Sequence, residues 1–340
     1  MAHVLVTGAT GFIAAHCIAI LLARGHTVRG TARSVSRAGG LNTLLSDYTD
    51  TPVEVPLVAA DLEKDAGWDD AVEGVDAVFH VASPLPTNVP RDPDTVIKPA
   101  RDGALRVLKA AKAAGVKRVV MTSSVAAIAY GWGEGRPEIL TEAHWSNPDN
   151  LKANTPYTRS KTIAEKAAWD YVAGDGAGIE LTTINPSAVL GPVMGGDFSA
   201  SLQIITQLME GKLPATPRVG FQIVDVRDVA EAHVLALETE AAIGQRYAVT
   251  EDFMWFSEVA DLLRDAYPNH PKSIPSGEMP NWLLRLMAPL NPPVKQLLPE
   301  LGKRRIVSSD KARDELGWTP RPAREAVLAA ADSLLRHRVV

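Results

Sequence analysis

The fold is decided at the start of the chain, by the stretch HVLVTGATGFIA at residues 3–14. Its first five residues are mostly apolar and β-branched, which is typical of a strand buried on both faces of a parallel sheet. Gly8 and Gly11 follow at once, and a helical pattern then runs as far as Gly25, a residue suited to a left-handed helix cap. The stretch therefore predicts a strand, a glycine turn and a helix.

Strands and helices continue to alternate through the first half of the chain. Helical patterns are clearest at residues 94–114 and 156–173. Further strand-like runs occur at residues 27–32, 54–59, 77–81, 118–122 and 180–185. This alternation predicts βαβ units, and hence an α/β fold with a doubly wound parallel sheet that helices cover on both faces.

The pattern changes after residue 185. Three glycines and two prolines crowd into residues 186–196, and the helical segments beyond them are interrupted by prolines. We expect residues 1–185 to form the sheet domain and residues 186–340 to form a smaller, mainly helical lobe that binds substrate. Residues 221–229 are strand-like and are a candidate for a return to the main sheet.

Composition excludes several classes of protein. The 340 residues are 46% hydrophobic and 22% charged, which allows a buried core and argues against a disordered chain. A net charge of −5 argues against a dedicated nucleic-acid binder. Cys17 is the only cysteine, and no histidine or acidic spacing favours a metal, so we expect no metal site. The sequence shows no leader and no apolar run of spanning length, which favours a soluble, cytoplasmic protein with no membrane partner.

The turn Gly8-x-x-Gly11-x-x-Ala14 is typical of the first turn of a dinucleotide-binding Rossmann fold. Glycines let the backbone approach a pyrophosphate, and the helix that follows offers free N–H groups and a partial positive charge. A glycine turn without a ligand is the alternative, which the place of the motif at the chain start disfavours. The residues of this turn expected to bind the cofactor are Gly8, Thr10, Gly11, Phe12 and Ile13.

The choice of cofactor depends on the end of the second strand. A carboxylate there would bind the ribose 2′-hydroxyl of NAD, but this chain has Arg33, with Arg37 four residues later. A guanidinium can pair with a 2′-phosphate, so we expect NADP(H) rather than NAD(H). Two solvated arginines are the alternative. Asp61 and Leu62, after the third strand, are expected on the adenine side of the same pocket.

A Tyr-x-x-x-Lys motif, Tyr157 to Lys161, lies at the start of the helix predicted at 156–173. Residues four apart share one helix face, and a neighbouring ammonium is expected to lower the pKa of a phenol toward working range. Ser123 and Ser124 end the preceding strand, where a hydroxyl can hold a carbonyl oxygen. Each motif alone is common, and their order downstream of the glycine turn favours a catalytic site.

With these motifs the chain resembles the extended short-chain dehydrogenases/reductases, in the group of dihydroflavonol reductases, cinnamoyl-CoA reductases and microbial aldehyde and ketone reductases. One departure is Ala100, where many extended members carry an asparagine of a proton relay. The matching stretches span nearly the whole chain and are residues 4–14, 28–34, 79–84, 96–103, 122–124, 157–161, 184–192, 222–229 and 308–320.

The resemblance implies roles for individual residues. Ser124, Tyr157 and Lys161 are expected to form the catalytic triad, with Ser124 preferred to Ser123. The other positions implied to contact cofactor are Ala82 and Ser83 on the ribose and phosphate side, Pro186 and Val189 beside the nicotinamide, and Ser201 near the phosphates.

The sequence therefore predicts an NADPH-dependent carbonyl reductase or alcohol dehydrogenase, acting as a monomer or homodimer on a small molecule. Three alternatives remain open: a nucleotide-sugar epimerase or dehydratase, a hydroxysteroid dehydrogenase, and a non-catalytic NADP-sensing protein. Few cations lie near the expected substrate loops, the candidates being Arg136, Lys212 and Arg218, so an apolar or aromatic carbonyl substrate is favoured. The residues expected to wall the substrate pocket are Ser83, Ile128, Tyr130, Trp132, Met194 and Phe198.

Overall fold

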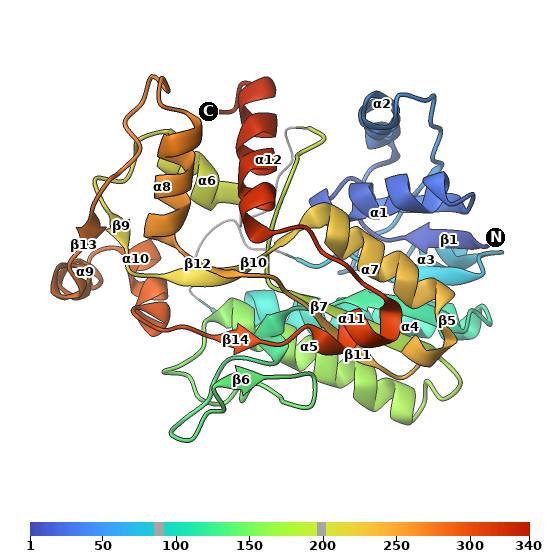
Figure 1. Cartoon of the computed structure of the whole chain (residues 1–340). Coiled ribbons are helices and arrows are strands. Elements are labelled where there is room, and N and C mark those ends of the chain that lie inside the picture. The colour runs from blue at the N-terminus through green and yellow to red at the C-terminus, as the bar shows by residue number, and fades with distance from the viewer. Residues whose placement is uncertain (85–91, 196–201) are drawn as a thin grey trace.

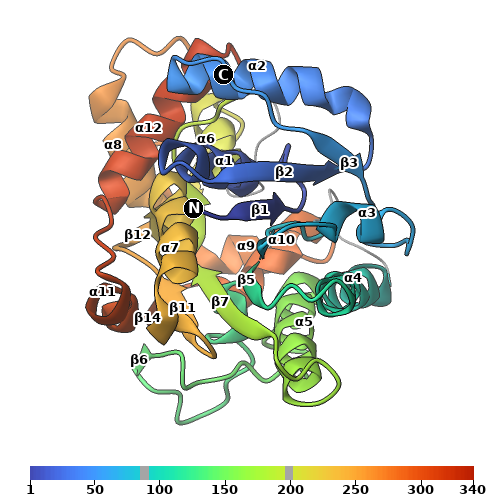
Figure 2. The ribbon, with the colours of Figure 1, turned by 90° about the vertical axis from the view of Figure 1, so that its right-hand side faces the viewer.

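A seven-stranded parallel sheet forms the centre of the computed structural model, which describes residues 1–84, 92–195 and 202–340 (Figures 1 and 2). The strand order is β11-β7-β5-β4-β1-β2-β3, and every neighbouring pair is parallel. The order reverses between β1 and β4, which is the switch point where doubly wound sheets bind their ligands. The strands are β1 (His3–Val6), β2 (Thr27–Ala32), β3 (Leu57–Ala59), β4 (Ala77–His80), β5 (Arg118–Thr122), β7 (Glu180–Pro186) and β11 (Arg246–Val249).

Helices cover both faces of this sheet, as Figure 2 shows. One face packs against α1 (Phe12–Ala23) and α7 (Val226–Glu238), which contact each other, with α2 (Ala38–Thr49) beside α1. The other face packs against α3 (Trp68–Val72), α4 (Asp94–Ala113) and α5 (Pro156–Ala173). The prediction of a doubly wound Rossmann fold is confirmed.

A smaller lobe is built on a three-stranded sheet, in the order β12-β10-β8. Figure 1 shows α12 of this lobe beside α6 and α8, and these helices also contact one another. Its larger elements are β8 (Ala188–Leu190), α6 (Leu202–Met209), β10 (Gly220–Asp225), β12 (Phe253–Trp255), α8 (Phe256–Ala266), α9 (Asn281–Met287), α10 (Pro292–Leu297) and α12 (Ala323–Arg336). The helix α11 (Asp310–Leu316) packs instead against β11 and α7 of the main sheet domain.

Short elements complete the chain. Two small parallel pairs join β9 (Thr216–Pro217) to β13 (Glu278–Met279) and β6 (Ile139–Leu140) to β14 (Ile306–Val307). The single-turn helices are η1 (Val35–Arg37), η2 (Val125–Ala127), η3 (Glu240–Ala242) and η4 (Leu298–Glu300). Within the described ranges, no helix is long and apolar enough to span a bilayer.

Residues 221–229, the predicted candidate for a return to the main sheet, do not join it. Residues 220–225 are β10, which pairs in parallel with β8 and antiparallel with β12. The buried Asp225 then caps α7 by accepting a hydrogen bond from the Arg227 backbone N–H at 2.8 Å. Because β11 supplies the seventh strand instead, the main sheet draws on residues beyond the predicted boundary at 185.

Candidate active site

The glycine turn has the geometry of a phosphate cradle. Gly8 adopts φ +63°, and a Cβ atom at this position would lie 3.0 Å from the Ala82 Cβ. The Gly11 N–H donates to the Gly8 carbonyl at 2.8 Å, and α1 begins at the next residue. Among the described residues no side chain caps this helix end, so its first N–H groups have no side-chain acceptor there. The turn therefore fits the pyrophosphate of a dinucleotide.

Thr7 and His80 hold the opposite wall of this cradle. The Thr7 hydroxyl oxygen accepts a hydrogen bond from the Ala82 N–H at 3.0 Å and lies 3.1 Å from His80 Nδ1. Burial, with the nearby Lys161 ammonium, lowers the pKa of His80 to about 3, so the ring is neutral at physiological pH. His80 thus acts in structure, fixing where β4 ends against β1.

The predicted cofactor-selecting residues lie at the carboxyl ends of neighbouring strands. Arg33 directly follows β2 and is exposed, and Arg37 closes η1. Asp61 follows β3, where its carboxylate accepts the Glu63 N–H at 3.1 Å. Leu62 packs against α4, where a Cβ atom added to Gly103 would lie only 2.9 Å from the Leu62 Cβ. Arg33 and Arg37 therefore lie beyond the carboxyl end of β2, the strand that pairs with β1. A 2′-phosphate would be placed on this side of the turn.

Local sequence fixes where α5 begins and which face carries the catalytic motif. Thr155 and Thr158 form a reciprocal capping box, and Pro156 occupies the first turn. Tyr157 and Lys161 then lie one turn apart on one face, with the Lys161 Nζ 5.9 Å from the centroid of the Tyr157 ring. The structure brings the two residues together as the spacing predicts.

Ser124 reaches the same place from β5. Its hydroxyl accepts the Ala126 N–H at 3.1 Å and lies 3.4 Å from the Pro186 carbonyl oxygen, to which it donates. The Ser124 hydroxyl also hydrogen-bonds Tyr157, which lowers the pKa of that phenol, but burial raises the pKa more and the net shift is upward. The predicted net lowering of the Tyr157 pKa is therefore wrong. Desolvation dominates, and Tyr157 stays protonated at neutral pH.

Lys161 is the group whose pKa moves toward neutrality. Burial lowers the pKa of this ammonium to about 8, and the charge of Glu165, one turn further along α5, opposes the shift. Only 8% of Lys161 is exposed. A small pocket brings this side chain together with Ala82, Ser83 and Ala100. Many extended members carry the proton-relay asparagine at position 100. Here Ala100 thus presents only a methyl group to this pocket.

Glu165 is a site residue that the sequence reasoning missed. Its side chain is completely buried, and its carboxylate accepts hydrogen bonds from five side chains, which come from α5, β7, β11 and the residue that follows β5. A single acidic residue on an amphipathic helix gives no sign of this, because its partners lie up to 81 residues away. The donors are Ser123 Oγ, Thr183 Oγ1 at 3.2 Å, Asn185 Nδ2 at 2.7 Å, Arg246 Nε at 2.6 Å and Trp169 Nε1 at 3.4 Å.

This network separates the two serines at the end of β5. The Ser123 hydroxyl is engaged by Glu165, whereas the Ser124 hydroxyl faces Tyr157. The geometry supports Ser124 as the catalytic serine, as preferred from the sequence. Arg246 closes the network, with its guanidinium carbon 3.6 Å from the centroid of the Trp145 ring. Glu165 thus ties together the strands that carry Ser124 and Pro186 and the helix that carries Lys161.

The residues predicted to lie beside the nicotinamide are at the end of β7 and in β8. The Pro186 carbonyl accepts a hydrogen bond from the Ser124 hydroxyl. Val189 is buried in β8, where it pairs with Val224 of β10. Between them, the buried Ser187 Oγ has no hydrogen-bond partner among the described residues. A hydroxyl without a partner in the described part of the chain, one residue beyond the carbonyl that accepts from Ser124, fits a polar ligand edge. Ser201, predicted near the phosphates, lies outside the described residues.

The predicted substrate wall is only partly assembled. Ile128 is completely buried in a core cluster, so it supports the loop rather than facing substrate, while Tyr130 and Trp132 pack on this cluster and stay partly exposed. Met194 lies outside this cluster, and its neighbour Gly195 passes so close to α2 that a Cβ there would meet Leu44. Phe198 lies outside the described residues. Tyr130 and Trp132 therefore remain the candidates for the predicted aromatic wall.

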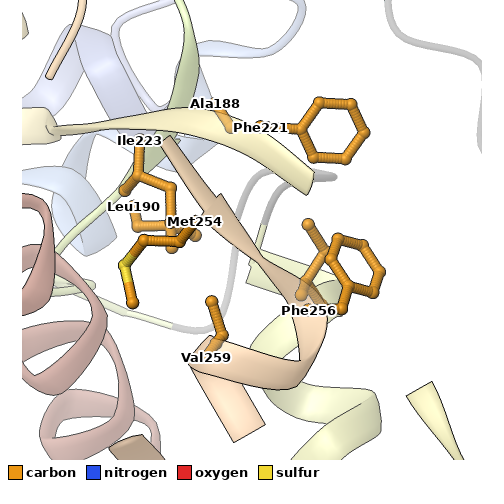
Figure 3. Close-up of a pocket in the computed structure, with 8 residues that line it drawn as sticks. Ala188, Leu190, Phe221, Ile223, Met254, Phe256 and Val259 are labelled. Atoms are coloured by element: carbon orange, nitrogen blue, oxygen red, sulfur yellow. The ribbon is translucent and has the colours of Figure 1, made fainter. Parts of the chain in front are cut away.

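A second, wholly apolar pocket lies in the smaller lobe. Figure 3 shows Leu190, Ile223 and Met254 gathered toward Val259 of α8, with Phe221 and Phe256 at its other side. No titratable side chain lines it. It is part of the packing between the small sheet and its helices and brings no chemistry to the site. Within the described ranges, no cluster of histidine, cysteine or acidic residues has the arrangement of a metal site.

Comparison with known proteins places this site in a family. Residues 4–250 match the model of the NAD dependent epimerase/dehydratase family. The chain is 36% identical over 277 residues to a tetraketide alpha-pyrone reductase of Arabidopsis thaliana, covering 80% of this chain and 84% of that protein. It is 37% identical over 270 residues to a cinnamoyl-CoA reductase of Medicago truncatula, covering 78% and 81%.

Solved structures agree. The yeast methylglyoxal/isovaleraldehyde reductase complexed with NADPH superposes with a TM-score of 0.77 at 27% identity, over 99% of each chain. A Rossmann sheet with a Tyr-x-x-x-Lys helix beside a glycine turn defines the extended short-chain dehydrogenases/reductases. This chain belongs to the NAD dependent epimerase/dehydratase family and is an oxidoreductase of that extended branch. The predicted family and enzyme class are confirmed.

Proposed function

We propose that the protein is an NADPH-dependent carbonyl reductase. The observation that carries the proposal is the convergence of Ser124, Tyr157 and Lys161 beside the pocket that adjoins the glycine turn. The reductases among its relatives, and the bound NADPH of the yeast reductase, support the same activity. A non-catalytic NADP-sensing role is disfavoured, because a binder has no need of a phenol paired with Ser124 and Lys161.

The cofactor is NADP(H). Gly8, Gly11 and the start of α1 would hold the pyrophosphate, and Arg33 and Arg37 the 2′-phosphate. The free Ser187 hydroxyl and the Pro186 carbonyl lie where the nicotinamide end would meet the protein. When bound, NADPH supplies the hydride that reduces the carbonyl carbon.

The chain's own groups control the proton. Tyr157, kept protonated by its raised pKa, is placed to donate its hydroxyl proton to the carbonyl oxygen. Ser124 donates a hydrogen bond to the same oxygen and fixes its position. Lys161, with a pKa near 8, is charged at neutral pH and favours the phenolate that proton transfer leaves on Tyr157. Ser124 and Lys161 are buried and Tyr157 is half-buried, so these contacts act in a medium less polar than water.

The expected substrate is an aldehyde, ketone or keto ester with an apolar or aromatic body, because Tyr130 and Trp132 offer flat apolar surface. The test is NADPH consumption, followed by absorbance, over a panel of aromatic carbonyls and nucleotide sugars. We expect turnover with the aromatic carbonyls. Turnover or inhibition dominated by nucleotide sugars would favour an epimerase or dehydratase instead.

Replacing Arg33 by Asp is expected to reverse or abolish a preference for NADPH over NADH. The change removes a charge-assisted contact and places a repelling carboxylate at the end of β2. We expect kcat/KM for NADPH to fall by about 10²-fold, which is two factors of ten at about 1.4 kcal/mol each. We expect kcat/KM for NADH to be maintained or to rise. Arg29→Gln, further back on β2, is the matched control. Equal kcat/KM for both cofactors in the unchanged protein would refute the assignment.

Replacing Trp132 by Ala is expected to reorder substrates more than it weakens NADPH binding. The Trp132 indole N–H donates to the Ile128 carbonyl at 2.9 Å, which fixes the ring against the loop beyond β5. Its loss should lower kcat/KM for bulky aromatic carbonyls about tenfold, and that for small aldehydes less. Steady-state kinetics over the panel measures this ranking. Equal loss for every substrate would mean that Trp132 supports the fold rather than the pocket.

A further inference from the structure

A run of cations from the end of the chain lies beside the aromatic wall. The parallel pair β6–β14 joins Ile139 to Ile306 and Leu140 to Val307 (Figure 1). Because both strands run the same way, the segment before β14, Lys303-Arg304-Arg305, lies next to the segment before β6, which carries Arg136. The sequence shows few cations near the substrate loop at residues 128–136, because residues 303–305 are far from that loop along the chain.

Contacts anchor two of these cations in place. The guanidinium carbon of Arg305 lies 4.7 Å from the centroid of the Tyr130 ring, and Arg305 Nη2 donates to Glu300 Oε1 at 3.0 Å. Arg136 Nη2 donates to the Arg304 carbonyl at 3.1 Å. The side chains of Arg305 and Glu300 are only 12% and 11% exposed. Arg305 is therefore held, with most of its surface covered, against the ring that walls the proposed substrate site.

Tyr130 connects this group to the catalytic tyrosine. Its backbone is fixed by a hydrogen bond from its N–H to Ser146 Oγ at 2.8 Å. The phenol is buried, and its pKa is raised by this burial and by the neighbouring Glu300 and Tyr157, while Arg305 opposes the shift. The charges of both Tyr157 and Arg305 thus act on the Tyr130 phenol, and Arg305 lies over its ring.

Two of these guanidinium groups carry donors without an acceptor among the described residues. Arg136 Nη1 and Arg305 Nε are buried and have no hydrogen-bond partner in the part of the chain that the structure describes. Burial and the neighbouring Arg305 lower the pKa of both Arg136 and Lys303, with Glu300 opposing. Buried donors without acceptors are costly, and guanidinium groups match the planar oxygens of carboxylates and phosphates. The arrangement has the chemistry of an anion site that Glu300 fills only in part.

We propose that Arg305 and Arg136 form a subsite for an anionic oxygen group, a carboxylate or phosphate carried by the substrate at the end remote from its reacting carbonyl. This inference rests on the proposed reductase function and makes it more specific. The carbonyl would lie at Tyr157, the aromatic body along Tyr130, and the anionic group at Arg305. Substrates of the proposed class that carry such a group should therefore be preferred to their uncharged analogues.

Three para-substituted benzaldehydes test the subsite: 4-carboxybenzaldehyde, its methyl ester, and 4-formylphenyl phosphate. The acid and its methyl ester have the same aromatic body but differ in charge. Comparison of the phosphate with the acid shows which of the two anionic groups the subsite prefers. We expect kcat/KM to be about tenfold higher for the acid or the phosphate than for the ester. In Arg305→Gln and in Arg136→Gln this ratio should fall toward one. Arg324→Gln, an exposed arginine on α12, is the matched control and should keep the ratio.

Two measurements keep the outcomes separate. Thermal unfolding identifies any variant that fails to fold. If one arginine variant fails to fold, the other still tests the subsite. If none of the three aldehydes is reduced, the proposed function fails, and calorimetric binding of 4-carboxybenzaldehyde to the NADPH-loaded protein then tests the subsite alone. Binding that is lost in Arg305→Gln supports the subsite. Equal use of acid and ester, a ratio unchanged in both variants, or no binding would overturn it.

Discussion

Replacing Tyr157 by Phe is expected to lower kcat by about 10²–10⁴-fold, the usual contribution of a positioned acid. The substitution removes the hydroxyl that Ser124 contacts and leaves the ring beneath Lys161 in place. The Kd for NADPH should change little, because the glycine turn and Arg33 are untouched. Initial rates with an aromatic aldehyde, together with NADPH titration by fluorescence, measure the two quantities separately.

Tyr171→Phe is the matched control, because Tyr171 lies on the same helix and away from the pocket. It should keep turnover close to that of the unchanged protein. A Tyr157→Phe variant that retains near-normal kcat would show that another residue donates the proton. A loss of NADPH binding equal to the loss of turnover would show instead that Tyr157 is needed for the cofactor rather than for the proton.

Replacing Glu165 by Gln is expected to destabilise the fold by about 3 kcal/mol and to shift the pH profile. The change leaves the guanidinium of Arg246 buried without its carboxylate, and it weakens four further hydrogen bonds to one side chain. Denaturant unfolding measures the free energy of unfolding. Asp170→Asn, exposed on the same helix, is the control that should leave this free energy unchanged.

The sign of the pH effect follows from Lys161. Its pKa of about 8 means that the ammonium is charged below pH 8 and neutral above, so reduction should decline as pH rises through that value. Glu165 raises the pKa of Lys161 against the effect of burial, and the neighbouring His80 is neutral in this range. Removing the Glu165 charge should therefore move the alkaline decline of kcat/KM to lower pH. An unchanged profile, with only stability lost, would make Glu165 purely structural.

The parts of the site that sequence could predict are those encoded over short distances. Gly8 and Gly11 lie between one strand and one helix, and Tyr157 and Lys161 lie one helical turn apart, so spacing alone places them. The fold class followed for the same reason, because strand and helix patterns are local. The seventh strand, β11, did not, because it is four residues long and each of its residues pairs with a β7 residue 63 positions earlier (246 − 183 = 63).

What sequence could not show depends on burial and on distant contacts. The Tyr157 and Lys161 spacing predicts a lowered phenol pKa, but only the packing reveals that desolvation dominates and raises it. Glu165 and Arg246 meet across 81 positions, and Arg305 reaches Tyr130 only through the β6–β14 pair. Such contacts leave no periodic pattern in the chain, so they require the fold to be known.

The central claim, that hydride passes from NADPH to a carbonyl carbon at Tyr157, is tested most directly by isotope transfer. The protein is incubated with an aromatic aldehyde and NADPH that carries deuterium at the transferable C4 position, and the product is analysed by mass spectrometry. We predict an alcohol with one deuterium on the carbinol carbon, formed in step with NADPH consumption and strongly reduced in Tyr157→Phe. Absence of deuterated alcohol, or conversion of a nucleotide sugar without net NADPH consumption, would contradict the account.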